Sequence, residues 1–572
     1  MEAEKKLTGY PSIDKPWLKY YTEEAINAPL PECTIYEDLW ENNKDHLDDV
    51  ALIYFGKKIT YGELFDNIEK TTKAFAYFGI KNGDMVAICS VATPELIYSM
   101  YALNRLGAVA NILEPRNNAE RILDYLKLTD SKFMVMIDKC YPKINSIIDD
   151  SPLEKVIVIS PTETANLITK IGANFKSEKV KYNKKQYIGW KDFLKFSADY
   201  TAATYEKDKA AIVIYTGGTT GIPKGVLLSN DAMNAVAYNM SNLDDLFKRH
   251  KKFLNVMPPF IAYGVTCGIH MPLVCGMVVT VVSNFTPEKL ASYILKHKPN
   301  SLMGVPAHYD MVSKNPIMKN QDLSFLECCG AGGDAFNPSI EKSVNEFLIS
   351  HQAPFKVSKG YGMTEACSAE TACYTNHNKD GSVGIPFCKN TAAIFKPDSE
   401  EELPYNEIGE ICFNTPSRML GYVKNDSETA KVIKTHKGGT IWIHTNDLGY
   451  IDEDGFVFIV GRIKRMVVKP DGHNVFPSAV EAVICSHPAV DSCSVVGKKA
   501  VGTNGKYPFA FVVLKPEYKG HEIEIQEELV QLGLQKMPER EQAEFYRFID
   551  KLPLTPIGKV DYRALEQEAE NK

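Results

Sequence analysis

The amino-acid sequence predicts an α/β fold with a large N-terminal domain, residues 1–462, in which helices cover parallel-rich sheets. We expect a small α+β C-terminal domain, residues 463–572, to follow it. Two observations lead to this prediction. The 572 residues are too many for one ordinary hydrophobic core. Strand-like and helix-like segments alternate to about residue 460, and shorter mixed elements replace them beyond that point.

The first elements of the large domain follow from hydrophobic periodicity. The apolar segment 50–55 predicts a strand, and the segment 60–79 predicts an amphipathic helix. Strands at 85–90 and 133–138 flank a predicted helix at 93–107. Because such alternation indicates parallel strands, we expect ligands to bind at the carboxyl ends of these strands.

The pattern changes near "GRIKR" at 461–465, where we place the join between the domains. The Asp-Gly pair within segment 450–462 predicts a hairpin just before it. The remaining elements predict a compact α+β domain, with helices at 476–488, 524–537 and 561–570 and strands at 492–497 and 507–515.

Composition excludes several classes of protein. The formal net charge of −7 gives no general basic field for nucleic acid or anionic lipid. The charged N-terminus does not resemble a signal peptide, and the apolar stretch 271–282 is too short to span a bilayer. Thirteen cysteines without a CxxC pair fit reduced thiols rather than a disulfide framework. We therefore expect a cytoplasmic enzyme or binding protein.

A glycine-rich loop at 215–225, "YTGGTTGIPKG", follows an apolar strand at 210–215. Glycines let a backbone approach an anion, while threonine hydroxyls and a lysine supply donors and positive charge. The loop is not a Walker A motif, because Lys224 is followed by a strand-like segment at 225–229 and by no Ser/Thr ligand for magnesium. A merely flexible turn is the rival interpretation. The candidate phosphate-binding residues are Thr216, Gly217, Gly218, Thr219, Thr220, Gly221 and Lys224.

This loop resembles the signature loop of the adenylate-forming superfamily, which includes acyl-CoA synthetases, adenylation domains of peptide synthetases and luciferases. The resemblance implies that the loop holds the β- and γ-phosphates of ATP. "GYGMTEACS" at 360–368 is similar to a second motif of the family, which implies that Tyr361 packs on adenine, Thr364 meets the α-phosphate and Glu365 holds Mg²⁺. "GAGGDAF" at 330–336 resembles the loop that passes the adenine. These two motifs add Gly332, Gly333, Asp334, Gly362 and Met363 to the candidate ATP site.

Two further motifs precede the predicted join. "RMLGYVKNDSET" at 418–429 resembles a family motif, with Asp426 where proline is usual. In "HTNDLGYIDEDGFVFIVGR", Asp447 and Arg462 lie fifteen residues apart, the spacing of the ribose-binding pair of the family, and Asn446 replaces a glycine. A carboxylate can accept hydrogen bonds from both ribose hydroxyls, and a guanidinium offers several donors.

The C-terminal segment "LPLTPIGKVDYRAL" resembles the last motif of the family, and it implies that Lys559 reaches into the site during adenylation. In the relatives the small domain is mobile, and Lys464 stands at the hinge position. The resemblance also makes Lys469, Gly472 and His473 candidates for a coenzyme A channel, although His473 has an equally ordinary interpretation as a surface residue.

The acid-binding segment departs from the family pattern. Many relatives place a histidine where "MPPFIAYGVTCG" carries Phe260 and Ile261, so we expect a more apolar pocket for an aliphatic or aryl acid. Core packing is the rival explanation for most pocket candidates. The basic run 248–252 is either a site for the 3′-phosphate of CoA or a solvated helix end. The pocket candidates are Ile261, Ala262, Tyr263, Gly264, Met303, Gly304, His308 and Cys328.

The resemblance implies an AMP-forming acid–thiol ligase that uses ATP, Mg²⁺ and CoA as a co-substrate. The expected partner is a small-molecule carboxylic acid. We expect neither a nucleic-acid partner nor a transmembrane segment, and a homodimer is left as an open alternative. An alternative is a ligase that delivers the acyl group to a separate carrier protein; CoA is favoured because no carrier domain follows residue 572. A nucleotide or acyl-adenylate sensor without catalysis is the third hypothesis. The presence of Glu365, Asp447, Arg462 and Lys559 argues against it.

Overall fold

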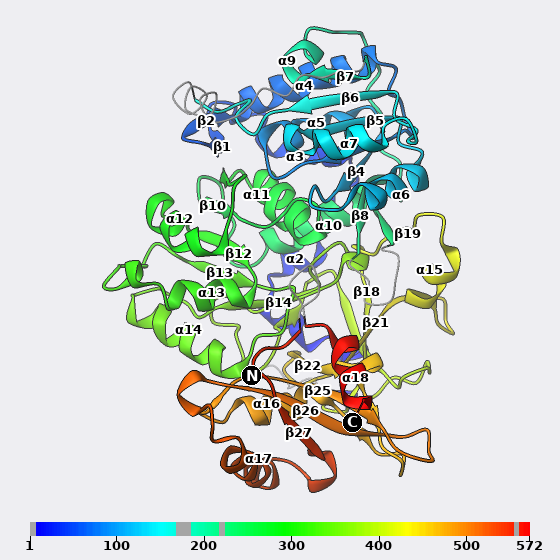
Figure 1. Ribbon diagram of the computed structural model, residues 1–572. Coiled ribbons are helices and arrows are strands. Elements are labelled where there is room, and N and C mark those ends of the chain that lie inside the picture. Colours follow the sequence, from blue (N-terminus) through cyan, green and yellow to red (C-terminus); the bar gives the residue numbers. More distant parts are fainter. Residues whose placement is uncertain (1–6, 167–184, 217–223, 554–559, 572) are drawn as a thin grey trace, which may run out of the picture.

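The computed structural model describes residues 7–166, 185–216, 224–553 and 560–571 (Figure 1). Three sheets with their helices form the large domain, and the C-terminal domain lies below them in the figure. The large and small domains expected from the sequence are both present. Within the described segments, no helix is both long enough and apolar enough to cross a bilayer. All thirteen cysteines fall in these segments, and none is in a disulfide.

The first sheet has eight strands in the order β19-β9-β8-β4-β3-β5-β6-β7. Its six strands from β8 to β7 run parallel, and only β9 and β19 at one end pair antiparallel. The strands are β3 (Met85–Cys89), β4 (Val109–Leu113), β5 (Phe133–Ile137), β6 (Lys155–Ile159), β7 (Tyr187–Gly189), β8 (Ala210–Tyr215), β9 (Gly225–Ser229) and β19 (Gly421–Tyr422).

The second sheet has nine strands in the order β16-β15-β14-β13-β12-β10-β11-β1-β2. Its six central strands are parallel, and the two ends are antiparallel. The strands are β1 (Val50–Tyr54), β2 (Lys57–Thr60), β10 (Lys252–Asn255), β11 (Val278–Val281), β12 (Ser301–Gly304), β13 (Cys328–Ala331), β14 (Ser358–Tyr361), β15 (Thr371–Ala372) and β16 (Ile385–Pro386).

Apolar helices fill the space around these sheets. α5 (Pro94–Arg105) begins at Thr93, whose hydroxyl accepts a hydrogen bond from Leu96 N at 3.2 Å, and nearly its whole length is buried. α4 (Tyr61–Tyr77) packs on it, and α3 (Ile35–Asn43) contacts both α5 and α10 (Asn230–Ser241). The other helices of the large domain are α1 (Pro11–Asp14), α2 (Glu23–Asn27), α6 (Ala119–Thr129), α7 (Tyr141–Ile147), α9 (Trp190–Phe193), α11 (Met271–Val274), α12 (Leu290–His297), α13 (Pro306–Ser313), α14 (Pro338–Ser350) and α15 (Asp426–Val432).

The third sheet corrects one prediction, because the parallel pattern does not continue to residue 460. β17 (Thr391–Phe395), β18 (Gly409–Asn414), β20 (Ile433–Thr435), β21 (Ile441–Ile451) and β22 (Val457–Arg462) pair antiparallel throughout. Short turns join β20 to β21 and β21 to β22, and a parallel crossover needs a dozen or more residues. The Asp-Gly hairpin expected within 450–462 is confirmed.

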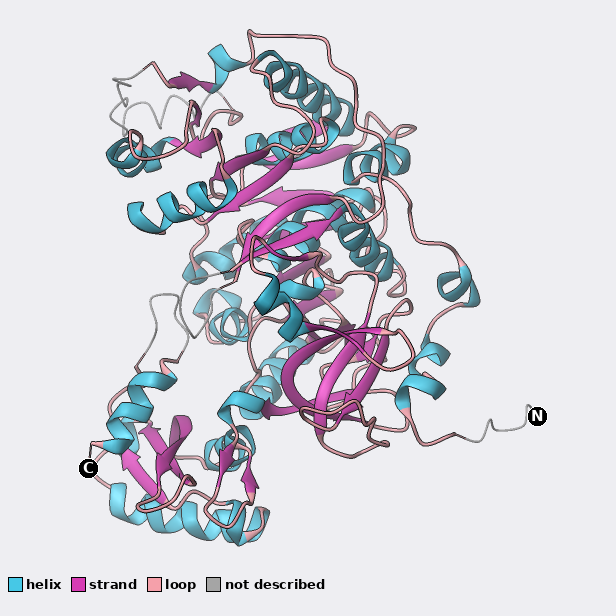
Figure 2. Cartoon of the chain, turned by 90° about the vertical axis from the view of Figure 1, so that its right-hand side faces the viewer, coloured by secondary structure: helices cyan, strands magenta, loops and turns pink. Residues whose placement is uncertain are grey.

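The C-terminal domain has its own apolar core around a three-stranded sheet (Figure 2). Its strands are β25 (Val490–Lys499), β26 (Lys506–Leu514) and β27 (Phe545–Phe548), with the short pair β23 (Val467–Val468) and β24 (Asn474–Val475) beside them. Its helices are α16 (Pro477–Cys485), α17 (Glu522–Lys536) and α18 (Tyr562–Glu570). Each strand and helix expected beyond residue 465 is present, with ends that differ by a few residues.

Candidate active site

The carboxylate of Asp447, on β21, is the group at which residues of the candidate site meet. Asp447 Oδ1 lies 2.8 Å from Arg462 Nε, and Asp447 Oδ2 accepts a hydrogen bond of 2.6 Å from Tyr361 Oη. The hairpin β21–β22 makes Asp447 and Arg462 direct cross-strand partners, while Tyr361 ends β14 of the nine-stranded sheet. Burial raises the pKa of Asp447, and the arginine and the tyrosine hydroxyl oppose that shift. Three residues of two motifs thus meet at one point.

The residue before Asp447 shapes this meeting point. Asn446 has a φ of 59°, in the left-handed region that asparagine tolerates better than most residues. Its backbone N–H donates to Glu410 Oε1 at 2.9 Å. The asparagine is therefore accommodated where the family motif has glycine, and the β-bulge of β21 that presents Asp447 is held by a side chain of β18.

A second group of contacts links the other motifs. Tyr422 Oη donates to Glu365 Oε1 at 2.6 Å, and Lys224 Nζ lies 4.8 Å from the centre of the Tyr422 ring. Lys224 also pairs with Glu428 of α15, and Lys224 together with Lys431 lowers the pKa of that carboxyl to about 2. Thr216 N donates to Lys224 O at 3.0 Å, so the two described ends of the glycine-rich loop are joined. Sequence reasoning missed Tyr422 and Glu428, although both lie inside the motif at 418–429.

Steric crowding explains why several motif positions are glycine. A Cβ on Gly362 would lie 1.7 Å from Ser368 O, so the turn before Thr364 has no room for a side chain. Gly333 has a φ of 80°, which favours glycine. A Cβ added to Gly332 would lie 3.3 Å from Gly360 O. Asp334 is exposed and accepts a hydrogen bond from Ala335 N at 2.9 Å. Met363 and Thr364 follow Gly362 at the edge of the site, and both are partly exposed.

The acid-pocket candidates gather around η3 (Tyr263–His270), a π-helical segment. Tyr263 Oη lies 3.4 Å from Gly330 O, and Met303 is the register partner of Gly330 in the neighbouring strand. Ile261 and Ala262 directly precede η3. Within η3, Gly264 packs against Pro258 O and has no space for a Cβ. Gly304 is the last residue of β12. Cys328 begins β13, two residues before Gly330. His308 lies against Gly304, and burial lowers its pKa to about 4, so it is neutral at pH 7.

Sequence reasoning missed Asn255 at the carboxyl end of β10. The side chain is 1% exposed, and neither its amide oxygen nor its amide nitrogen has a hydrogen-bond partner among the described residues. Its Oδ1 would lie 3.0 Å from a Cβ on Gly268 of η3, and Met303 is its cross-strand partner. Since a buried amide without partners costs about 1–3 kcal/mol, this position is suited to a polar ligand group. An asparagine at the end of an apolar strand is the signal that could have found it.

The candidates of the small domain lie apart from this centre. Lys464 is exposed in η7 (Ile463–Arg465), directly after β22. Lys469 Nζ lies 2.5 Å from Glu544, and His473 Nε2 lies 3.6 Å from Glu541, so both pair inside their own domain. Gly472 has a φ of 82° in the turn between them. Lys559 and residues 217–221 of the glycine-rich loop lie outside the described residues.

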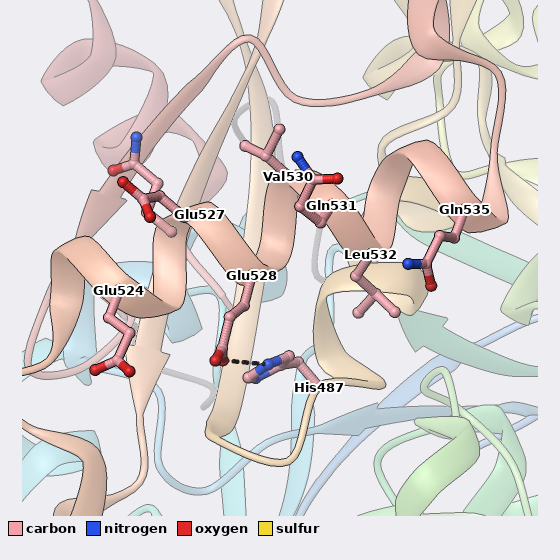
Figure 3. A pocket seen from close by; sticks show the side chains of 9 residues that line it. His487, Glu524, Glu527, Glu528, Val530, Gln531, Leu532 and Gln535 are labelled. Atoms are coloured by element: carbon pink, nitrogen blue, oxygen red, sulfur yellow. Dashed lines mark ion pairs between the residues drawn. The ribbon is translucent and has the colours of Figure 1, made fainter.

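Two other features do not belong to the centre. Arg249 and Lys251 of the basic run 248–252 pair with Asp49 and Glu327, which favours an ordinary ion-paired surface there. Figure 3 shows a surface cavity on the C-terminal domain that is lined by residues of α17 and by His487, whose Nε2 lies 3.0 Å from Glu528. No residue that lines this cavity belongs to a motif of the candidate site.

Comparison with known proteins identifies the family. The family model described as AMP-binding enzyme matches residues 39–423. The chain belongs to the AMP-binding enzyme family. A second model, described as AMP-binding enzyme C-terminal domain, matches residues 479–559 of this AMP-binding enzyme. The two matches therefore fall on the large and the small domain separately.

Relatives of this AMP-binding enzyme extend over nearly its whole length. A long-chain-fatty-acid–CoA ligase of Bacillus subtilis is 27% identical over 97% of this chain and 99% of its own. A probable 4-coumarate–CoA ligase 1 of Dictyostelium discoideum is 28% identical over 87% of this chain and 88% of its own.

Solved structures share the fold. The anthranilate CoA ligase AuaEII in complex with anthranoyl-AMP has a TM-score of 0.80 at 21% identity, covering 95% of this chain and 98% of that one. ATP-bound MatB from Rhodopseudomonas palustris has a TM-score of 0.79 at 21% identity, covering 94% and 99%. The predicted fold class of this AMP-binding enzyme is confirmed.

Gly362 gives a direct test of the site geometry. We expect Gly362→Ala to lower the free energy of unfolding by about 1–3 kcal/mol, because its Cβ would overlap a backbone carbonyl. Loss of ATP binding should accompany it, since the turn carries Tyr361 and Thr364. Thermal unfolding and calorimetric titration with ATP measure both effects.

Gly189 provides the matched control for this variant. It has a φ of −73° and no atom within 4 Å of an added Cβ, so Gly189→Ala should leave stability and ATP binding unchanged. Equal behaviour of the two variants would contradict the steric account.

Proposed function

We propose that this AMP-binding enzyme activates a carboxylic acid with ATP and transfers the acyl group to the thiol of CoA. In the first step a carboxylate oxygen attacks the α-phosphorus, the bond to the β-phosphate oxygen breaks, and pyrophosphate leaves. In the second step the thiol sulfur attacks the acyl carbonyl, the thiol proton is lost, and AMP leaves. The observation that carries the proposal is the convergence of Tyr361, Asp447 and Arg462, within family motifs, at one carboxylate.

The nucleotide has a proposed position at this carboxylate. Asp447 would accept hydrogen bonds from the ribose hydroxyls, and Arg462, with a side chain 66% exposed, can turn toward ribose or phosphate. Tyr361 would pack against adenine beside the loop of Gly332, Gly333 and Asp334. Thr364 would donate to the α-phosphate, and residues 216–221 with Lys224 would hold the leaving phosphates.

The carboxylate proposed for Mg²⁺ fits that role. Glu365 Oε1 is held by Tyr422, while Glu365 Oε2 accepts no hydrogen bond within the described part of the chain, so a carboxylate oxygen is available to a hard cation. When bound, Mg²⁺ would neutralise phosphate charge. Tyr422 orients Glu365, and Lys224 Nζ lies 4.8 Å from the centre of its ring, so Lys224 and a Mg²⁺ held by Glu365 would both be close to Tyr422.

Domain movement would allow one site to run both steps. We propose that residues 463–572 rotate about Lys464, so that Lys559 faces the α-phosphate during adenylation and a different surface faces it during thiol attack. The exposure of Lys464 directly after the last strand of the large domain supports a hinge there. Lys469, Gly472 and His473 are proposed to line the path of the CoA thiol arm.

We infer the chemical class of the acid from the residues that surround η3. Phe260, Ile261 and Ala262 give the segment before η3 an apolar character, which favours an aliphatic or aryl acid. Asn255 adds one unpartnered amide beneath η3. We therefore infer an acid whose chain or ring carries a polar substituent that bonds to this amide.

Pyrophosphate release over a panel of fatty, aryl and amino acids, each with and without CoA, tests the function. A CoA thioester together with AMP is the expected product. Turnover that needs a carrier protein would favour the alternative acceptor. ATP binding without pyrophosphate release for any acid would favour a sensor.

Lys559 carries the catalytic prediction. We expect Lys559→Ala to lower carboxylate-dependent pyrophosphate exchange by about 10²–10³-fold, the scale of one preorganised electrostatic contact in a transition state. Lys551, exposed in the same domain, is the control, and Lys551→Ala should exchange at the wild-type rate. An unimpaired Lys559→Ala variant would refute the assignment.

Asn255 carries the specificity prediction. Replacement by the similarly sized Leu should lower kcat/KM about 10-fold for the preferred substituted acid, because one hydrogen bond to the acid is lost. The unsubstituted analogue is the internal control, and its kcat/KM should stay equal or rise. A parallel loss for both acids, measured by steady-state kinetics, would show that Asn255 serves only the packing of η3.

A further inference from the structure

A buried cluster of metal-ligating side chains lies on the antiparallel sheet, outside the proposed ATP site. It consists of Glu410 and Cys412 on β18 and His444 on β21. One ligand atom of each residue lies within 4.8 Å of the other two, and all three residues are at most 4% exposed. No step of the proposed reaction uses any of these side chains.

Strand register explains why these residues meet. Glu410 and Cys412 are two positions apart on β18, so they share a face of the sheet. Cys412 is the cross-strand partner of His444. Phe413, between Cys412 and the end of the strand, points to the opposite face, where its ring lies 6.1 Å from that of Tyr361. The cluster thus occupies the back of the sheet whose front carries the candidate ATP site.

Both ring nitrogens of His444 and both carboxylate oxygens of Glu410 have hydrogen-bond partners. His444 Nδ1 lies 2.8 Å from Glu410 Oε2, and His444 Nε2 lies 3.0 Å from His436 Nε2. The other oxygen of Glu410 accepts the hydrogen bond from Asn446 N. Ligating histidines in metalloproteins are oriented in this way, with the far ring nitrogen fixed by a neighbouring polar group. Nδ1 is therefore the nitrogen of His444 that faces Glu410.

The surroundings of the cluster are apolar. Phe395 lies with its ring centre 4.6 Å from that of His436 and 5.1 Å from that of Trp442. In such a place the Glu410 carboxylate needs polar partners, and here it contacts His444 Nδ1 and accepts a hydrogen bond from Asn446 N. A divalent cation bound to a carboxylate and a thiolate would have its charge neutralised by these two ligands.

We propose that Glu410, Cys412 and His444 bind one Zn²⁺, with His436 orienting His444. The mixture of thiolate, imidazole and carboxylate favours zinc over the oxygen-preferring Mg²⁺ or Ca²⁺. The ion ties β18 to β21 beside the β-bulge at Asn446 and Asp447. Its role is to fix that bulge, and it takes no part in the chemistry.

Metal content of the full-length chain tests this site. The protein is produced without a polyhistidine tag in zinc-supplemented medium, dialysed, and analysed for zinc. About one zinc per chain is expected for the wild type. Cys412→Ser and His444→Gln should lose it. Cys373→Ser, which removes another fully buried free thiol, should keep it.

Cobalt provides a second readout that does not depend on activity. The chelator-treated wild-type chain should take up Co²⁺ and show a thiolate-to-cobalt charge-transfer band, which Cys373→Ser retains and Cys412→Ser lacks. Because Cys412 is fully buried, His436→Gln tests the site from its edge and should weaken zinc binding about 10–100-fold. Circular dichroism verifies that each variant is folded.

Three results would overturn the proposal. The first is a wild-type chain that carries no zinc and takes up no Co²⁺. The second is equal zinc content in the wild type, Cys412→Ser and His444→Gln. The third is zinc affinity in His436→Gln equal to that of the wild type. The first two would leave Glu410, His444 and His436 as a hydrogen-bonded chain that holds no metal, and the third would remove His436 from the proposed site.

Discussion

The contact of Asp447 with Arg462 and Tyr361 is the interaction on which the rest of the site depends. It joins β14 of the nine-stranded sheet to the hairpin of the antiparallel sheet, and Arg462 directly precedes η7, where we propose the hinge. A carboxylate with a side chain only 6% exposed would be costly alone, so a guanidinium and a hydroxyl are needed to hold it. The same contact therefore positions the proposed ribose site and the end of the large domain.

Charge explains the remaining arrangement. Acid and ATP are both anions, and the site must bring them together with fixed positive groups rather than with mobile water. Lys224 contacts the ring of Tyr422 and Glu365 accepts a hydrogen bond from its hydroxyl, so one aromatic side chain connects the proposed phosphate-binding and Mg²⁺-binding residues. The cluster of Glu410, Cys412 and His444 lies on the opposite face of the same sheet, where the proposed zinc would tie β18 to β21. The two faces of β18 thus serve different purposes.

The sequence predicted those parts that depend on local pattern. The Asp-Gly pair predicted the hairpin, and its register makes Asp447 and Arg462, which the family resemblance had named as a pair, cross-strand partners. Parallel pairing beyond residue 391 was wrong, since periodicity identifies a strand without its partner. The Gly-Gly turn at 438–439 was the overlooked signal. The isolation of Asn255 and the meeting of Cys412 with His444 arise from packing between distant segments, and no local pattern contains that information.

Oxygen transfer from the acid to AMP tests the central claim most directly. An acid that supports turnover is labelled with ¹⁸O in its carboxylate and incubated with enzyme, ATP and CoA. Attack of the carboxylate on the α-phosphorus predicts one ¹⁸O atom in the phosphate of the released AMP, detected by mass spectrometry. Unlabelled AMP, or label found in pyrophosphate or inorganic phosphate, would contradict adenylation at this site.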